Sequence, residues 1–197
     1  FDSHPTVKDE ESAQAALQTF FTKFEYPILQ DGDTIEKDYG DRLALSKFPV
    51  VLCDLDGTLC NIDHRVHWVR SENKKERRWD KFFAEIPGDS LNDEVDYLLS
   101  GMRFQGYPIA FVSGRGEDTR SSTREWLTKH SRNGHSPLYM RPAKDSRPDY
   151  LIKEIILDFE ILTRYSKVLF VLDDRDSVVA MWRKRGIRCL QVAPGAF

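Results

Sequence analysis

The stretch PVVLCDLDGTLCNIDHR, from Pro49 to Arg65, contains an apolar run that leads directly into two aspartates and a tight turn. Residues 50–53 have the composition of a buried strand, and Asp54 and Asp56 follow at its carboxyl end. Side chains at positions i and i+2 of an extended segment point to the same side. The two carboxylates therefore address one point, where they can bind a divalent cation or divide an acid and a base role. A capped turn is the alternative interpretation of this motif taken alone.

Downstream of this stretch, short β-rich runs alternate with segments of helical periodicity. The predicted strands are 49–54, 108–113, 137–141, 167–173 and 187–193. The segments between them carry apolar residues at helical spacing, as at 95–102, 152–159 and 178–182. Apolar strands that alternate with helices are typical of a parallel sheet covered on both faces. The sequence therefore predicts a Rossmann-like α/β fold with its active site at the carboxyl ends of the strands.

Two segments depart from this alternation. Residues 1–48, with an amphipathic pattern at about 9–25, are predicted to be an accessory helical segment or linker before a main domain at 49–197. Residues 60–90 carry a second apolar face beside the charged run KKERR at 74–78, and this face consists of Trp79, Phe82, Phe83 and Ile86. We expect a small helical cap insertion that roofs the first strand. A solvated surface helix explains KKERR equally well.

Composition and charge exclude several classes of protein. The chain of 197 residues is 40% hydrophobic and 31% charged, as ordinary globular proteins are. Its formal net charge of −3 does not support a long electrostatic track on duplex nucleic acid, although a short basic pocket remains compatible with it. No apolar run reaches membrane-spanning length. Cys53, Cys60 and Cys189 lack metal-ligand spacing, which favours reduced thiols in a cytoplasmic protein. Because the chain begins with Phe, we expect it to be a fragment or a processed form.

Two further strand ends carry polar side chains. The run 167–172 leads into Asp173-Asp174-Arg175, and the run 108–112 leads into Ser113-Gly114-Arg115-Gly116. A hydroxyl, a flexible backbone and a guanidinium suit a phosphate oxyanion. Because parallel strands end at the same edge of a sheet, we expect both acidic pairs and this cradle to meet in a metal-dependent phosphate site.

These motifs resemble those of the haloacid dehalogenase (HAD) superfamily of phosphotransferases. The DxDGT motif of that superfamily matches residues 54–58, its strand-terminal Ser or Thr matches Ser113, and its acidic pair matches Asp173-Asp174. A closer resemblance, to phosphatase domains of bacteriophage polynucleotide kinase–phosphatases, extends from Val51 to the C-terminus. It depends on VSGR at 112–115, the spacing of Asp149 and Lys153, Arg65 nine residues after Asp56, and the segment DDRDSVVAMWRKRGIRCLQVAPGAF at 173–197.

The chain departs from this pattern in three respects. No G-x-x-x-x-G-K-[ST] motif occurs, so the chain contains no kinase P-loop. The insertion at 66–87 is longer and more basic than the resemblance implies, and residues 1–48 have no counterpart. These departures bear on the substrate and not on the chemistry.

The resemblance implies the chemical roles of the acidic residues. Asp54 would be the nucleophile, which forms an aspartyl-phosphate that water then hydrolyses. Asp56 would protonate the leaving oxygen and then activate the water, which requires a raised pKa in the free enzyme. Mg²⁺ would be held by Asp54, Asp174 and the backbone carbonyl of Asp56, with Asp173 acting through water.

The resemblance also implies the groups that hold the substrate. Ser113 and Lys153 would bind the transferring phosphoryl oxygens, and Asp149 would position Lys153 or Arg115. The remaining substrate-binding residues would be Arg65, Arg115 and Gly114. A solvated helical pair of Lys153 with Asp149, and a purely structural Arg65, are the alternatives.

Other residues have weaker signals. His64, His67, His130 and His135 lack a complete ligand set and are interpreted as surface residues. Trp68 or Trp79 could stack on a terminal base, and core packing of the insertion explains them as well. Asp145-Ser146-Arg147 could touch substrate, although a polar loop accounts for these residues too.

The function expected from the resemblance is a Mg²⁺-dependent phosphomonoesterase that removes a 3′-phosphate or 2′,3′-cyclic phosphate from nucleic-acid ends before ligation. The expected partners are RNA or DNA 3′ ends, with a kinase domain upstream in the full-length protein. A phosphatase of free nucleotides or small phosphate esters would use the same site and is one alternative. A catalytically inactive binding domain of the same fold is the other.

Overall fold

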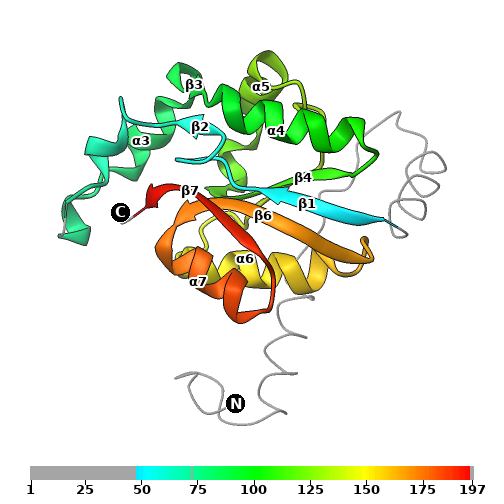
Figure 1. The fold of residues 1–197 in the computed structure, drawn as a ribbon. Coiled ribbons are helices and arrows are strands. Elements are labelled where there is room, and N and C mark those ends of the chain that lie inside the picture. The colour runs from blue at the N-terminus through cyan, green and yellow to red at the C-terminus, as the bar shows by residue number, and fades with distance from the viewer. Residues whose placement is uncertain (1–47, 72, 196–197) are drawn as a thin grey trace, which may run out of the picture. The chain divides into compact units, whose positions relative to one another are not determined.

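The computed structural model describes residues 48–71 and 73–195 (Figure 1). The predicted accessory segment and its helix at about 9–25 lie outside the described residues, Phe48 apart. None of the helices in the described part is long and apolar enough to cross a membrane.

A parallel sheet of five strands forms the centre of the fold, in the order β5-β4-β1-β6-β7. The strands are β1 (Pro49–Cys53), β4 (Ile109–Gly116), β5 (Leu138–Arg141), β6 (Lys167–Arg175) and β7 (Cys189–Gly195). The middle strand is β1, in which Val51 pairs with Ile109 of β4 on one side and with Phe170 of β6 on the other. The stretch that opened the analysis therefore lies at the centre of the sheet.

Helices cover both faces of this sheet (Figure 1). One face carries α4 (Asp93–Phe104) and α5 (Arg120–His130), and η4 (Glu117–Thr119) precedes α5. The other face carries α6 (Asp149–Ile156), its π-helical continuation η5 (Leu157–Ile161) and α7 (Asp176–Lys184). The predicted α/β fold, with a parallel sheet between two helical layers, is confirmed.

The two helical layers follow from the alternation of side chains along β1. Val51 and Cys53 belong to the core with α4 and α5, whereas Val50 and Leu52 belong to the core with α6 and α7. All four side chains are fully buried. A uniformly apolar strand is stable only where both faces of its sheet are covered, which is what the sequence of β1 requires.

Two of the covering helices end at glycines that the sequence marks. After α4, the N–H of Gly106 donates to Arg103 O and the N–H of Tyr107 donates to Met102 O. The end of α7 has the same pair of bonds around Gly186. Both glycines have positive φ, +86° and +72°, so these are Schellman motifs.

The insertion after β1 is less regular than the predicted helical one. It is closed by an antiparallel pair, β2 (Cys60–Asn61) and β3 (Ser90–Leu91). Between these strands lie η1 (Val66–Trp68), η2 (Lys74–Glu76), α3 (Trp79–Ala84) and η3 (Ile86–Gly88). The pairing of β2 with β3 was not predicted, because strands of two residues are too short to show an alternating pattern.

Three strands, β4, β6 and β7, continue past their predicted ends, and the pairing in these extensions is irregular. The pairing of β4 with β5 shifts register between Ser113 and Gly116, and that of β6 with β7 shifts between Asp173 and Arg175. Irregular pairing of this kind redirects side chains and is frequent beside active sites. Both shifts lie at the strand ends that the sequence predicts to form the phosphate site.

The turn after β1 depends on Gly57. Its φ is +85°, which residues with a Cβ rarely adopt. Its N–H donates to Cys60 O at 2.9 Å, which closes the turn. A Cβ at this position would lie 2.3 Å from Oδ2 of Asp174, so only glycine lets the turn approach the end of β6 so closely.

Gly57→Ala is expected to lower the free energy of unfolding by at least about 1 kcal/mol, because of the left-handed backbone and the clash with Asp174. Gly101→Ala is the matched control: it lies in α4, where a Cβ meets nothing within 4 Å. That change should raise the free energy of unfolding by about 0.5–1 kcal/mol. Urea unfolding measures both, and a Gly57→Ala variant as stable as the parent would contradict this account of the turn.

Candidate active site

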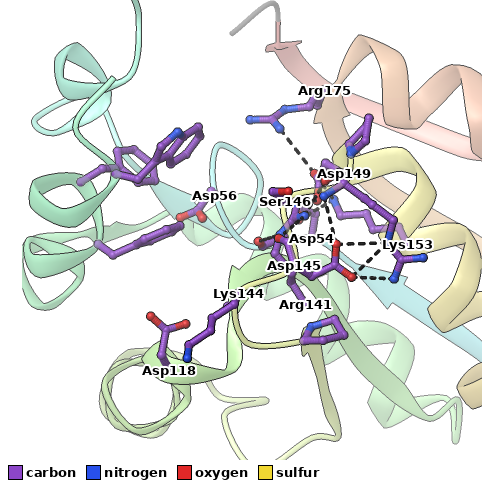
Figure 2. A pocket seen from close by; sticks show the side chains of 18 of the residues that line it. Asp54, Asp56, Asp118, Arg141, Lys144, Asp145, Ser146, Asp149, Lys153 and Arg175 are labelled. Atoms are coloured by element: carbon purple, nitrogen blue, oxygen red, sulfur yellow. Dashed lines mark hydrogen bonds and ion pairs between the residues drawn. The ribbon is translucent and has the colours of Figure 1, made fainter. Parts of the chain in front are cut away.

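A pocket of about 540 Å³ lies at the carboxyl edge of the sheet (Figure 2). Its floor is formed by residues at the ends of four strands, Asp54 and Asp56 after β1, Gly114 in β4, Arg141 in β5 and Asp174 in β6. Residues of the insertion and of the loop between β5 and α6 form its walls, and they include Arg77, Trp79, Phe82, Phe83, Lys144, Asp145, Ser146 and Arg147. The insertion therefore borders the carboxyl edge, where it was expected.

Three buried carboxylates meet beside this pocket. One oxygen from each of Asp54, Asp173 and Asp174 lies within 4.8 Å of the others. Asp54 is held there because its N–H donates to Leu172 O of β6 at 2.9 Å. Burial, reinforced by Asp173, raises the pKa of Asp174 to about 6. Burial also raises the pKa of Asp54 well above its usual value, although Lys153 opposes the rise.

The donor set of these carboxylates fits a hard divalent cation such as Mg²⁺. Asp54 and Asp174 line the pocket, so a cation bound to them has access to substrate. The room for the Asp174 carboxylate comes from the missing Cβ of Gly57. The cluster does not include the carboxylate of Asp56. No histidine of the described chain belongs to such a cluster.

Lys153 is a buried cation next to this cluster. It comes from α6, is only 1% exposed, and its Nζ donates to Asp54 Oδ1 at 2.7 Å and to Asp173 Oδ2 at 2.9 Å. Burial alone would lower the pKa of Lys153, but the carboxylates of Asp173 and Asp54 raise it well above its usual value. Lys153 is thus charged and directed at Asp54, and the solvated-pair interpretation is wrong.

Asp56 has entirely different partners, two fully buried arginines. Its Oδ1 accepts from Nη2 of Arg115 at 2.6 Å and from Nη2 of Arg65 at 2.5 Å. Both arginines also bind Asp89, which precedes β3 in the insertion. The Arg65 Nε–Asp89 Oδ1 distance is 2.5 Å, and the Arg115 Nη2–Asp89 Oδ2 distance is 2.9 Å. Two carboxylates and two guanidiniums thus form a charge-balanced cluster.

This cluster corrects two expectations about Asp56 and its arginines. Burial would raise the pKa of Asp56, but Arg115 and Arg65 lower it well below its usual value, so the expected raised pKa is wrong for this arrangement. Neither arginine is part of the pocket lining. Asp56 and Asp89 draw both guanidiniums inward, so in this arrangement Arg65 and Arg115 hold Asp56 from outside the pocket lining.

Ser113 and Gly114 have separate roles at the end of β4. The Ser113 side chain is fully buried outside the pocket lining, and its Oγ accepts from the N–H of Arg115 at 3.2 Å. Gly114 does line the pocket, and a Cβ there would lie 2.2 Å from Oδ1 of Asp149. Glycine therefore lets the start of α6 pack directly against the end of β4.

Asp149 holds several basic side chains at this junction. Its carboxylate lies 3.6 Å from Lys153 Nζ, 3.3 Å from Arg141 Nη2 and 3.6 Å from Arg175 Nη1 (Figure 2). Of the two predicted partners of Asp149, the structure thus favours Lys153, and no contact with Arg115 is present among the described residues. Arg141 also donates through Nε to Gly114 O at 2.7 Å.

Asp89 and Arg141 are site residues that the sequence reasoning missed. Arg141 closes the predicted strand 137–141, and the strand-end argument applied to 54, 113 and 173 would have found it. Asp89 had no such signal, because it follows a Pro-Gly turn in the irregular insertion. Of the weaker candidates, Trp79 and Asp145-Ser146-Arg147 do line the pocket, whereas Trp68 does not.

The model of the polynucleotide kinase PNKP phosphatase domain, a HAD-type domain, matches residues 49–197. The chain belongs to this family. Both resemblances drawn from the sequence, to the HAD superfamily and to polynucleotide kinase–phosphatases, are therefore confirmed. The buried carboxylates and Lys153 are the candidate active site of a HAD phosphatase domain, a hydrolase.

Individual relatives agree with this assignment. A protein of Autographa californica nuclear polyhedrosis virus, proposed to be a bifunctional polynucleotide kinase/RNA ligase, is 29% identical over 186 residues, which cover 87% of this chain and 24% of that protein. A chain in the structure of the Pnkp1/Rnl/Hen1 RNA repair complex is 30% identical, with a TM-score of 0.63, over 95% of this chain and 56% of that one.

A class C acid phosphatase from Bacillus anthracis, solved with tungstate bound, shares the fold at 15% identity. Its TM-score is 0.52, and the match covers 82% of this chain and 72% of that one. The chain thus spans about a quarter of the viral relative and about half of the RNA-repair chain.

Asp89→Ala is expected to lower the free energy of unfolding by about 3–5 kcal/mol, because two guanidiniums would stay buried with one carboxylate between them. Urea unfolding measures the change. The control is Asp80→Ala, which removes an exposed partner of Arg78 in the same insertion and should leave stability nearly unchanged. If both changes lowered the free energy of unfolding equally, the buried cluster would not be what stabilises the insertion.

Mg²⁺ is expected to raise the midpoint of thermal unfolding, because a cation bound by the three native carboxylates stabilises only the folded state. Asp174→Asn should abolish this shift, and without metal it should be at least as stable as the parent because it removes one of three repelling charges. Asp93→Asn, an exposed change in α4, should retain the full shift. A shift that survives in Asp174→Asn would place the cation elsewhere.

Proposed function

We propose that the chain is a Mg²⁺-dependent phosphomonoesterase that removes 3′-phosphate or 2′,3′-cyclic phosphate from nucleic-acid ends. The observation that carries the proposal is the meeting of Lys153, the three buried carboxylates and Asp56 at one pocket. The family model supports phosphatase chemistry, and the relative in an RNA repair complex supports nucleic-acid ends as substrate. We further propose that residues 49–197 are the phosphatase domain, that 1–48 are accessory, and that a kinase domain accompanies them in the full-length protein.

Asp54 is the nucleophile in this proposal. Its carboxylate oxygen forms a bond to phosphorus as the bond from phosphorus to the ester oxygen breaks, and the departing oxygen takes a proton from Asp56. Water then attacks the aspartyl-phosphate and gives its proton to Asp56, which releases phosphate and restores Asp54. Asp56 therefore recovers in the second step the proton that it gives up in the first.

The structure bears on the protonation of Asp56 in both steps. Arg65 and Arg115 hold it ionised in this arrangement, as the step that activates water requires. The first step requires a protonated Asp56. An anionic substrate phosphate beside Asp56 favours this, because a nearby like charge raises the pKa of the Asp56 carboxyl.

Asp54, Asp174 and the backbone carbonyl of Asp56 would hold Mg²⁺, with Asp173 behind them. The ion would supply the positive charge that lets a carboxylate approach a phosphate. Lys153 contributes from the protein side: it stays charged, orients Asp54 through the bond of 2.7 Å, and can bind the transferring phosphoryl oxygens with Ser113 behind it. Asp149 positions Lys153 from one helical turn away.

The walls of the pocket favour a phosphate at the end of a polymer. Five basic side chains besides Lys153 line the pocket, together with the carboxylates of Asp118, Asp145 and Asp149; they are Arg77, Arg141, Lys144, Arg147 and Arg175. Arg141 orders the β5–α6 loop, because it donates to Arg147 O at 2.6 Å and to Asp145 O at 3.2 Å. These side chains can contact an anionic strand that continues beyond the reacting phosphate.

The first prediction from this proposal concerns phosphate release in Mg²⁺. A 3′-phosphorylated oligonucleotide should be dephosphorylated, its 5′-phosphorylated isomer should not, and a nucleoside monophosphate should react more slowly than the 3′ end. Asp54→Asn should reduce release by several orders of magnitude, because the nucleophile is lost while the fold is kept. Chelation of the metal should stop the reaction, and added Mg²⁺ should restore it.

Each other outcome selects an alternative. Equal or faster release from the monophosphate would move the activity to free nucleotides with the same mechanism. No release from any of the three substrates would favour the inactive binding domain. Release that persists in Asp54→Asn would contradict the proposed nucleophile.

A further inference from the structure

We propose that Trp79 is a stacking surface for the terminal nucleobase, so that the insertion selects a phosphate whose sugar carries a base. This inference depends on the proposed function, because it assigns a specificity residue for the same reaction. It concerns the insertion at 66–87, whose aromatic side chains line the pocket.

Trp79 is an aromatic side chain left open in a charged pocket. It lines the pocket and is 39% exposed, whereas Phe82, its neighbour in α3, is 1% exposed. Phe83 lies against it with ring centroids 5.8 Å apart and planes 28° apart, and Phe82 meets it edge-on at 5.6 Å. The phenylalanines pack against the indole, and its exposed fraction leaves indole surface open to a planar ligand.

The position of Trp79 is tied to the reacting groups through Phe82. The guanidinium of Arg65 lies 4.0 Å from the centre of the Phe82 ring, and its Nη1 donates to Phe82 O at 3.3 Å. Arg65 in turn holds Asp56. The aromatic group and the proposed acid are thus parts of one packed unit, so a base stacked on Trp79 is held at a fixed position relative to Asp56.

The size of the pocket also supports a nucleotide rather than a phosphate alone. About 540 Å³ is much more than a phosphate group occupies, and it lies in the range of pockets that enclose whole small molecules. Charged side chains of the pocket, among them Lys153 and Arg175, would bind the phosphate end of such a nucleotide. An exposed indole beyond them matches the flat, weakly polar surface of a base, whatever its sequence.

The other tryptophan of the insertion is unsuited to this role. The Nε1 of Trp68 donates to Glu85 Oε1 at 2.9 Å, and Nζ of Lys81 lies 4.4 Å from the centre of its ring. Trp68 does not line the pocket. Its contacts are those of packing within the insertion, which makes it a matched control for the loss of an indole.

The test compares two 3′-phosphorylated oligonucleotides of equal length and sequence, one of which lacks the base of its terminal nucleotide. The parent should cleave the base-containing substrate with a kcat/KM roughly 5- to 100-fold higher, the range expected for one stacked base. Trp79→Ala should bring this ratio close to one. Trp79→Phe should retain most of the preference, because it keeps an aromatic face, and Trp68→Phe should retain all of it.

The possible failures are distinguishable. If Trp79→Ala lowers kcat/KM equally on both substrates, Trp79 is only structural and the inference is overturned while the proposed function stands. The same follows if the parent shows no preference for the base. If the parent releases no phosphate from either oligonucleotide, the proposed function fails and the inference fails with it.

Discussion

The repulsion among the carboxylates of Asp54, Asp173 and Asp174 is the constraint on which the site depends. Three buried acids within 4.8 Å of one another are unfavourable unless positive charge is brought to them. Lys153 supplies part of it, and the start of α6 must pack against the end of β4 for Lys153 to reach them. Gly114 permits that contact, and Gly57 leaves room for Asp174. Both positions therefore require glycine because a Cβ would displace a charged side chain of the site, Asp174 at Gly57 and Asp149 at Gly114.

The two aspartates of the DxD motif end in opposite electrostatic surroundings. The expectation that both address one point assumed that the strand continues, but β1 ends at Cys53 and the Gly57 turn takes over. Both carboxylates line the pocket, yet Asp54 faces Lys153 and the acidic cluster while Asp56 faces two arginines. Neighbouring groups whose pKa values are driven apart are suited to different chemical roles.

The parts of the molecule that could be predicted from the sequence depend either on a local pattern of side chains or on the order of the strands. The five strands and the two helical faces follow from apolar periodicity, and the meeting of Asp54 with Asp173 and Asp174 follows from the geometry of parallel strand ends. Asp89 could not be found in this way. Its role depends on the path of an irregular insertion, and only that path shows that its carboxylate reaches Arg65 and Arg115.

The same insertion connects the proposed base-stacking residue to the proposed acid. Asp89 fixes the arginines that hold Asp56, and its backbone O accepts from Nε1 of Trp126 of α5 at 2.9 Å, so the insertion is fastened to the helical layer as well as to the site. Phe82 packs on the guanidinium of Arg65 and contacts Trp79, which lines the pocket. A base that stacks on Trp79 would therefore contact the same packed group of side chains, Trp79, Phe82 and Arg65, that holds Asp56. Under the two proposals, the group that recognises the end of a strand and the group that protonates its leaving oxygen both depend on Arg65, whose guanidinium binds Asp56 beside Arg115 and packs on Phe82.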